Sequence, residues 1–141
     1  MQPALLDSSI YVSALRSGDA ANALERLTSE TILWLSAVVL EELYAGAREQ
    51  DRHVVETWER DFDKAGRILV PNLSDWIHAG KVLRRLADKY DYETIGRGRL
   101  TNDALIAISA ARTETRVITA NEKDFRRLAE FCSFPWQLAP L

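Results

Sequence analysis

Cysteine, histidine and long apolar runs are scarce in this sequence. Cys132 is the one cysteine in 141 residues, so no disulfide can form within the chain, and we expect a reducing compartment such as the cytoplasm. No run approaches the ~20 apolar residues of a membrane helix, and the first residues lack the basic stretch of a signal peptide. These absences favour a cytoplasmic protein with no membrane partner.

The chain contains only two histidines, and they disfavour two kinds of enzyme. His53 and His78 match no metal-ligand spacing, and neither is tied by spacing to a serine or cysteine nucleophile. We therefore expect both on the surface, and neither a zinc site nor a serine or cysteine triad. The stretch "GRGR" at 96–99 lacks the third glycine and the preceding strand of a dinucleotide fingerprint.

Hydrophobic residues make up 47% of the chain, enough for one sizeable core, and we expect a single domain over residues 1–141. Short apolar runs predict strands at 4–6, 31–35, 67–70 and 116–119. Helices are predicted at 8–17, 19–29, 36–48, 51–65, 74–90, 102–113 and 121–129, with Ser36, Ser74, Thr101 and Asn121 as N-caps and a long loop at 89–100. This alternation predicts an α/β fold, a three-layer α/β/α sandwich with a short parallel sheet.

An aspartate, Asp7, follows the first predicted strand. Ligands of parallel sheets bind beyond the carboxyl ends of the strands, so Asp7 stands at a position suited to a functional site. The structural alternative is that Asp7, Ser8 or Ser9 caps the next helix.

The helix "SAVVLEELYAGAR" contains two adjacent glutamates that fall on different faces. At 100° per residue, Glu42 lies within the apolar stripe that includes Val38 and Leu43, whereas Glu41 lies outside it. A buried carboxylate must be paired, protonated or bound to a metal. The alternative to a functional role for Glu42 is a buried pair with an arginine.

Two further acids stand near helix starts. Asp103 lies in the first turn of the predicted helix "TNDALIAISAAR". This helix is apolar on almost all sides, which predicts that it is buried. The structural alternative is that Thr101 or Asn102 caps the helix. Asp124, in "ITANEKDF", follows the last predicted strand, and Asn121 with Asp124 also resembles a capping box.

All four acids can converge on one pole of the sheet. Carboxylates gathered in one crevice require a cation, and oxygen ligands without cysteine or histidine select Mg²⁺ or Mn²⁺. We therefore predict a metal site formed by Asp7, Glu42, Asp103 and Asp124.

Taken together, four stretches make the chain similar to the PIN-domain ribonucleases, and among them to the VapC-type toxins of bacterial toxin–antitoxin pairs. They are "LLDSSIYV", "LSAVVLEELYAGA", "TNDALIAISA" and "ITANEKDF", in the family's order. The resemblance places the four family acids on Asp7, Glu42, Asp103 and Asp124, with Asn121 as the alternative to Asp124. It also places Ser9 and Thr119 beside these acids.

The resemblance implies a Mg²⁺- or Mn²⁺-dependent endoribonuclease that cleaves single-stranded or looped RNA as the toxin of a type II toxin–antitoxin system. It further implies a homodimer and a small cognate antitoxin whose C-terminal tail enters the site. Asp7 and Asp103 are expected to hold the metal most directly, and Glu42 and Asp124 to complete or orient the site.

The acidic composition, with a formal charge of −3, argues against nucleic acid held by bulk charge alone. Setting the four site acids aside leaves the remainder slightly basic, which makes RNA binding compatible with the sequence. The candidates for phosphate contacts are Arg48, Arg84, Arg85, Lys123, Arg126 and Arg127, with Arg97 and Arg99 preferred because they lie in a glycine-containing stretch. Two other functions remain open: a non-catalytic interaction module with this fold, and a phosphotransfer domain that uses Asp7 as acceptor.

Overall fold

The central sheet is built from five short parallel strands. The structure is a computed structural model that describes residues 2–91 and 99–139, and the strand order within these ranges is β3-β2-β1-β4-β5. The strands are β1 (Pro3–Leu6), β2 (Ile32–Ser36), β3 (Ile68–Leu69), β4 (Arg116–Thr119) and β5 (Trp136–Leu138). The predicted α/β fold with a short parallel sheet is confirmed.

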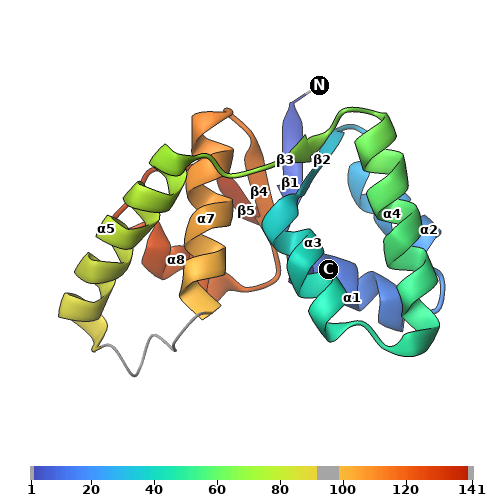
Figure 1. Cartoon of the computed structure of the whole chain (residues 1–141), viewed down its shortest axis with the longest axis horizontal. Coiled ribbons are helices and arrows are strands. Elements are labelled where there is room, and N and C mark those ends of the chain that lie inside the picture. The colour runs from blue at the N-terminus through green and yellow to red at the C-terminus, as the bar shows by residue number, and fades with distance from the viewer. Residues whose placement is uncertain (1, 92–98, 140–141) are drawn as a thin grey trace.

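Helices cover both faces of the sheet (Figure 1). They are α1 (Ser8–Arg16), α2 (Ala20–Thr28), α3 (Ala37–Gly46), α4 (Arg52–Lys64), α5 (Leu73–Tyr90), α7 (Arg99–Arg112) and α8 (Glu122–Leu128), with a 3₁₀ turn at Glu49–Asp51. The chain runs from β1 to β3 in one direction across the sheet, with α1 to α4 on one side. It then returns to β4 and β5 with α5, α7 and α8 on the other side, as right-handed crossovers require.

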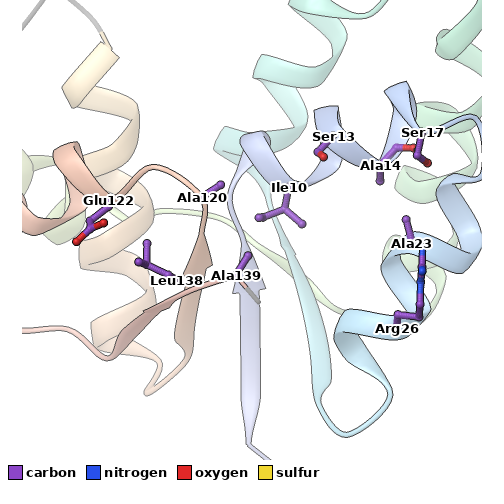
Figure 2. A pocket seen from close by; sticks show the side chains of 10 residues that line it. All are labelled: Ile10, Ser13, Ala14, Ser17, Ala23, Arg26, Ala120, Glu122, Leu138 and Ala139. Carbon is purple, nitrogen blue, oxygen red and sulfur yellow. The ribbon is translucent and has the colours of Figure 1, made fainter. Parts of the chain in front are cut away.

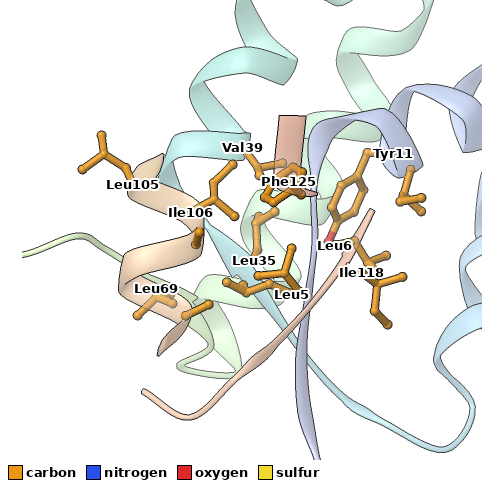
Figure 3. Packing of buried hydrophobic residues seen from close by; sticks show 14 of the residues in the cluster. Leu5, Leu6, Tyr11, Leu35, Val39, Leu69, Leu105, Ile106, Ile118 and Phe125 are labelled. Carbon is orange, nitrogen blue, oxygen red and sulfur yellow. The ribbon is translucent and has the colours of Figure 1, made fainter. Parts of the chain in front are cut away.

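The core lies on both faces of β1, the central strand. Leu5 and Leu6 are both fully buried, although neighbouring strand residues point to opposite faces. Leu35 and Val39 pack in this core, and Phe125 of α8 joins it (Figure 3). Both faces of β1 are therefore dry, and polar groups are accommodated at the strand ends.

Helix α7 is buried almost all round, as its apolar composition predicts. Residues 104–110 are buried, and the hydroxyl of Ser109 donates to the carbonyl oxygen of Leu105 at 2.6 Å. This helix begins at Arg99, so Thr101 lies inside it and the predicted cap at Thr101 is wrong.

Two of the other predicted caps are confirmed and one is wrong. Ser36 caps α3 by accepting from the N–H of Val38 at 3.2 Å, and Asn121 caps α8. Helix α5 begins one residue earlier than predicted, and Asn72 rather than Ser74 is its cap.

The remaining differences concern the last strand and the long loop. Strand β5 was not expected, because three residues after Pro135 carry little strand signal by themselves. Within the predicted loop, residues 92–98 and the side chain of Arg99 lie outside the described part of the chain. The prediction that Arg97 and Arg99 contact phosphates therefore falls outside the described residues. No helix in the described ranges is long and apolar enough to cross a membrane.

Candidate active site

Asp7 lies at the carboxyl end of β1, where the chain leaves the sheet. Its N–H donates to the carbonyl oxygen of Ile118 at 3.1 Å, which continues the pairing of β1 with β4. Strands β2 and β4 flank β1, and the chain reverses its direction across the sheet here, so Asp7 marks a topological switch point. The side chain is only 3% exposed.

The Asp7 carboxylate is held by two hydroxyl groups. Ser9 donates to Oδ1 at 2.5 Å, and Thr119, the last residue of β4, donates to Oδ2 at 2.6 Å. Asp7 also occupies the N-cap position of α1, where its side chain makes no capping hydrogen bond of ordinary geometry, although weaker interactions with the backbone of Ile10 and Ser9 lower its pKa. Burial raises the pKa of Asp7, and these hydrogen bonds oppose the increase.

Glu42 lies on the inward side of α3, as the helical phase predicts. It is half-buried, whereas its neighbour Glu41 is exposed. Its Oε1 atom is buried and has no hydrogen-bond partner within the described residues. Burial raises the pKa of Glu42, a hydrogen bond from Asn102 lowers it, and the negative charge of Asp7 raises it further.

These interactions bring three elements together at one point. Asp7 follows β1, Glu42 belongs to α3, and Asn102 belongs to the first turn of α7. In the described part of the chain, no basic side chain forms an ion pair with Asp7 or Glu42. None of the described arginines therefore forms the pair with Glu42 that the structural alternative requires. Buried, adjacent carboxylates without a cation require protonation or a metal ion.

Asn102 and Ser8 were missed as site residues by the sequence analysis. Both were considered only as helix caps, but each lowers the pKa of Glu42 through side-chain hydrogen bonding, Asn102 more strongly than Ser8. The available signal was position: Asn102 precedes Asp103 at the start of a buried helix. Asp103 is half-buried.

Asn121 and Asp124 form a small cluster connected to Asp7. The side-chain Oδ1 of Asn121 accepts from the N–H of Asp124 at 3.4 Å, and its Nδ2 donates to Asp124 Oδ2 at 2.9 Å. The N–H of Asn121 donates to Thr119 Oγ1 at 2.8 Å, and Thr119 in turn donates to Asp7. Asn121 therefore stands between Asp124 and the centre of the site.

The donor set fits a hard divalent ion, although the ligands do not form a closed cage. Across residues 2–91 and 99–139, no three side chains of histidine, cysteine, aspartate or glutamate are grouped closely enough to form a metal site by themselves. Mg²⁺ is commonly held by one or two carboxylates together with water and substrate phosphates. The Asp7–Glu42 pair, with the unpartnered Oε1 of Glu42, supplies such an arrangement.

Comparison with known proteins agrees with this geometry. A family model described as the PIN domain matches residues 4–131. The chain belongs to the PIN domain family. No curated protein matches it.

Solved structures share the whole fold of this PIN domain. VapBC2 from Rickettsia felis, bound to a DNA fragment from its promoter, is 23% identical with a TM-score of 0.68, and the match covers 99% of this chain and 100% of that one. DNA-bound VapBC from Salmonella typhimurium is 20% identical with a TM-score of 0.67, covering 98% of each chain. VapBC-1 from nontypeable Haemophilus influenzae is 25% identical with a TM-score of 0.64, covering 96% and 97%. The resemblance found in the sequence is therefore confirmed.

A pocket of about 550 Å³ in the PIN domain is lined by residues of α1, α2 and the end of β5, and none of the four predicted site acids lines it (Figure 2). Ile10 of α1 and Ala120 lie in its wall, and the N–H of Ala120 donates to Ser9 Oγ at 3.3 Å. Small side chains such as Ala14 and Ala139 keep the space open, and Arg26 of α2 stands at one end. The volume lies within the ordinary range for ligand pockets.

The two histidines and Cys132 contribute no catalytic group to this site. His53 and His78 are exposed, as expected. Cys132 is half-buried, and burial raises the pKa of its thiol to about 11, which makes it a poor nucleophile.

Proposed function

We propose that this PIN domain is a Mg²⁺- or Mn²⁺-dependent endoribonuclease that cleaves single-stranded or looped RNA. The observation that carries the proposal is a pair of neighbouring carboxylates at the topological switch point, the buried Asp7 and the half-buried Glu42, without a basic partner in the described chain. Family membership supports the same activity.

Each side chain has a distinct task in the proposed site. Asp7 and Asp103 would hold the ion most directly, and Glu42 and Asp124 or Asn121 would complete or orient the site. Ser9 and Thr119 fix both oxygens of Asp7, so the carboxylate presents its charge in one orientation. When bound, a divalent ion would activate water and neutralise charge on the scissile phosphate.

The phosphotransfer alternative is disfavoured by the surroundings of Asp7. A phosphate acceptor must be reached by its donor, but Asp7 is buried and both of its oxygens accept hydroxyl hydrogen bonds. An RNA-cleavage experiment distinguishes a nuclease from a non-catalytic interaction module. A circular single-stranded RNA incubated with wild-type protein should be opened in Mg²⁺ or Mn²⁺ but not in EDTA, and Asp7→Asn should leave it intact. An uncut circle in every metal would favour the non-catalytic module.

We also propose that the chain is the toxin of a toxin–antitoxin pair, with a small antitoxin protein as its partner. The likeness of the whole chain to VapBC structures supports this. Co-expression with the product of a neighbouring short reading frame should give a stable complex in which RNA cleavage is abolished. A neighbour that neither binds nor inhibits would contradict the assignment.

The proposed homodimer is supported by an apolar patch on the outer side of α5. Val70, Leu73, Trp76 and Ile77 are 63%, 74%, 54% and 51% exposed, and the last three share one helix face. Contiguous exposed apolar side chains of this kind mark protein–protein interfaces. A second copy of the chain is the occupant that we propose.

Gly80 continues the face of this patch along α5 without a side chain. It follows Leu73, Trp76 and Ile77 on the same face, and a Cβ there would contact nothing within the chain. Since glycine costs a helix about 1 kcal/mol relative to alanine, close approach of a second helix is a reason for its presence. Light scattering should give a dimer for the wild type and a monomer for Trp76→Glu, with Gly80→Ala weakening the dimer. A monomeric wild type would contradict the proposal.

A further inference from the structure

Basic side chains gather where α5 meets α8, on a chain whose net charge is negative. Residues 81–90 contain four basic residues and one acidic residue, although the formal charge of the whole chain is −3. Lys81, Arg85 and Lys89 follow one another at intervals of four, so they share one side of α5. This side faces Arg127 and Phe131, at and just beyond the end of α8.

Aromatic rings hold several of these cations in place. The guanidinium carbon of Arg85 lies 4.9 Å from the centre of the Phe131 ring, and that of Arg127 lies 4.6 Å from the centre of Tyr90. The Lys89 ammonium is 5.0 Å from the centre of Tyr90. Each arginine therefore stacks on a ring from the other segment, which restrains its head group more than a solvated side chain would be.

Two of these cations form no ion pair. Glu130 accepts a 2.6 Å hydrogen bond from Lys89 and one from the hydroxyl of Tyr90. Among the described residues, neither Arg85 nor Arg127 lies within ion-pair distance of a carboxylate. We name Arg85, Lys89 and Arg127, with Lys81 beside them, the basic face.

The basic face adjoins the carboxylate site. Arg127 lies one helical turn along α8 from Asp124. Helices α5 and α7 pack antiparallel, because Asp75 near the start of α5 bonds to Arg112 at the end of α7. The last turn of α5 therefore lies at the same pole as the first turn of α7 (Figure 1), which carries Asn102.

We propose that the basic face binds the phosphates of single-stranded RNA beside the cleavage site. This inference rests on the proposed function and adds to it the surface that holds the flanking strand. A guanidinium fixed on a ring offers paired N–H donors to a phosphate. The ring faces of Tyr90 and Phe131 are already covered by cations, so the RNA is held through its backbone and independently of base sequence.

The test compares the double variant Arg85→Gln/Arg127→Gln with the matched control Arg60→Gln, an exposed arginine on α4 across the sheet. For a single-stranded RNA of about twelve nucleotides in Mg²⁺, the double variant should raise KM about tenfold and leave kcat nearly unchanged. The slope of log affinity against log salt should fall by about 1.4, which is about 0.7 for each of the two phosphates that the variant no longer neutralises. Arg60→Gln should match the wild type in all three values.

Fluorescence anisotropy of labelled RNA separates failure of the basic face from failure of the nuclease proposal. If the wild type binds RNA but does not cut it, a tenfold loss of affinity in the double variant sustains the basic face while the nuclease proposal falls. Wild-type affinity and KM in the double variant would overturn the basic face, whatever the activity. A loss of affinity confined to duplex DNA, or a wild type without RNA affinity, would also overturn it.

Discussion

Asp7 is a charged group in an apolar position, and its surroundings determine which form it takes. The residues before it are fully buried leucines, and no cation of the described chain pairs with it. Hydroxyls from Ser9 and Thr119 orient the carboxylate but do not offset its burial, so its pKa rises. The same holds for Glu42, whose pKa is raised by burial and further by Asp7. In metal-free protein, burial therefore stabilises the protonated form of both acids relative to the unfolded chain.

These raised pKa values predict an unusual pH dependence of stability. Between the ordinary values of 3.8 and 4.5 and the higher values in the fold, the folded chain binds more protons than the unfolded chain. The contribution of Asp7 and Glu42 to the free energy of unfolding therefore falls as pH rises through this interval. In EDTA, the difference between Asp7→Asn and wild type in melting temperature should grow from pH 4 to pH 7, with the variant more stable at pH 7.

Thermal denaturation across this pH range, with Glu41→Gln as the control, measures the effect. Because Glu41 is exposed, its variant should follow the wild-type curve. A destabilised Asp7→Asn at pH 7 would show that the carboxylate has a structural role, contrary to this account.

The two adjacent glutamates of α3 provide a matched pair for activity. Glu42→Gln keeps the size of the side chain but removes the inward charge, so RNA cleavage at fixed Mg²⁺ should fall tenfold or more. Glu41→Gln should change cleavage little. Melting curves of both variants confirm folding, and equal losses, or a larger loss at Glu41, would sink the assignment of Glu42 to the site.

Residue-scale prediction from the sequence succeeded where helical geometry was sufficient. The phase of α3 distinguishes Glu42 from Glu41 without any knowledge of the neighbouring helices. The hydrogen bond from Asn102 depends instead on how α7 meets α3, which no local pattern specifies. Whether Asp7, Glu42, Asp103 and Asp124 bind metal stays a prediction.

At the scale of elements, Asp75 fixes the start of α5 through two interactions, a helix cap and an ion pair. Its Oδ2 accepts from the N–H of Asn72 at 3.0 Å, and Asn72 Oδ1 accepts from the N–H of Asp75 at 2.9 Å, which completes a capping box. Arg112 donates to the same carboxylate through Nε and Nη2 at 2.9–3.1 Å. This pairing sets the antiparallel arrangement of α5 and α7.

Removing Asp75 should therefore cost more than removing an exposed acid of the same helix. Asp75→Ala should lower the free energy of unfolding by about 3 kcal/mol, the low end for a broken buried pair because Arg112 is 38% exposed. Asp88→Ala, which breaks an exposed pair with Arg84, should cost less than about 1 kcal/mol. Urea denaturation gives both values, and similar losses would show that the Asp75 pair contributes no more than a surface contact.

Element prediction was reliable for long periodic segments and weak at their ends. Strands β1, β2 and β4 were placed within a residue or two, because continuous apolar runs are typical of buried parallel strands. Strand β5 was missed because its pairing with β4 supplies the order that Trp136–Leu138 lacks locally. The start of α5 was misplaced because Asn72 and Ser74 are both good caps, and only the bond to Asp75 decides between them.

At the scale of the whole molecule, the fold separates charges that the sequence mixes. Acids distant in sequence, such as Asp7 and Glu42, meet at one edge of the sheet, while the basic face collects on α5 and α8. The sequence indicated the fold class and the family, because these depend on the order of elements and on motifs. Arg85 and Arg127 were among the candidates for phosphate contacts, but their position in one basic face depends on two helices packing side by side, which the sequence does not specify.

The central claim is that the Asp7–Glu42 site binds a divalent ion and that this ion is required for RNA cleavage. The most direct measurement is a Mg²⁺ titration of the wild type followed by both melting temperature and cleavage rate, repeated with Asp7→Asn. The account predicts that both quantities rise over the same Mg²⁺ range, with about 2.7 kcal/mol of added stability at 100 times the dissociation constant, and that Asp7→Asn shows neither rise. Cleavage that persists in EDTA, or an unchanged wild-type melting temperature in millimolar Mg²⁺, would contradict it.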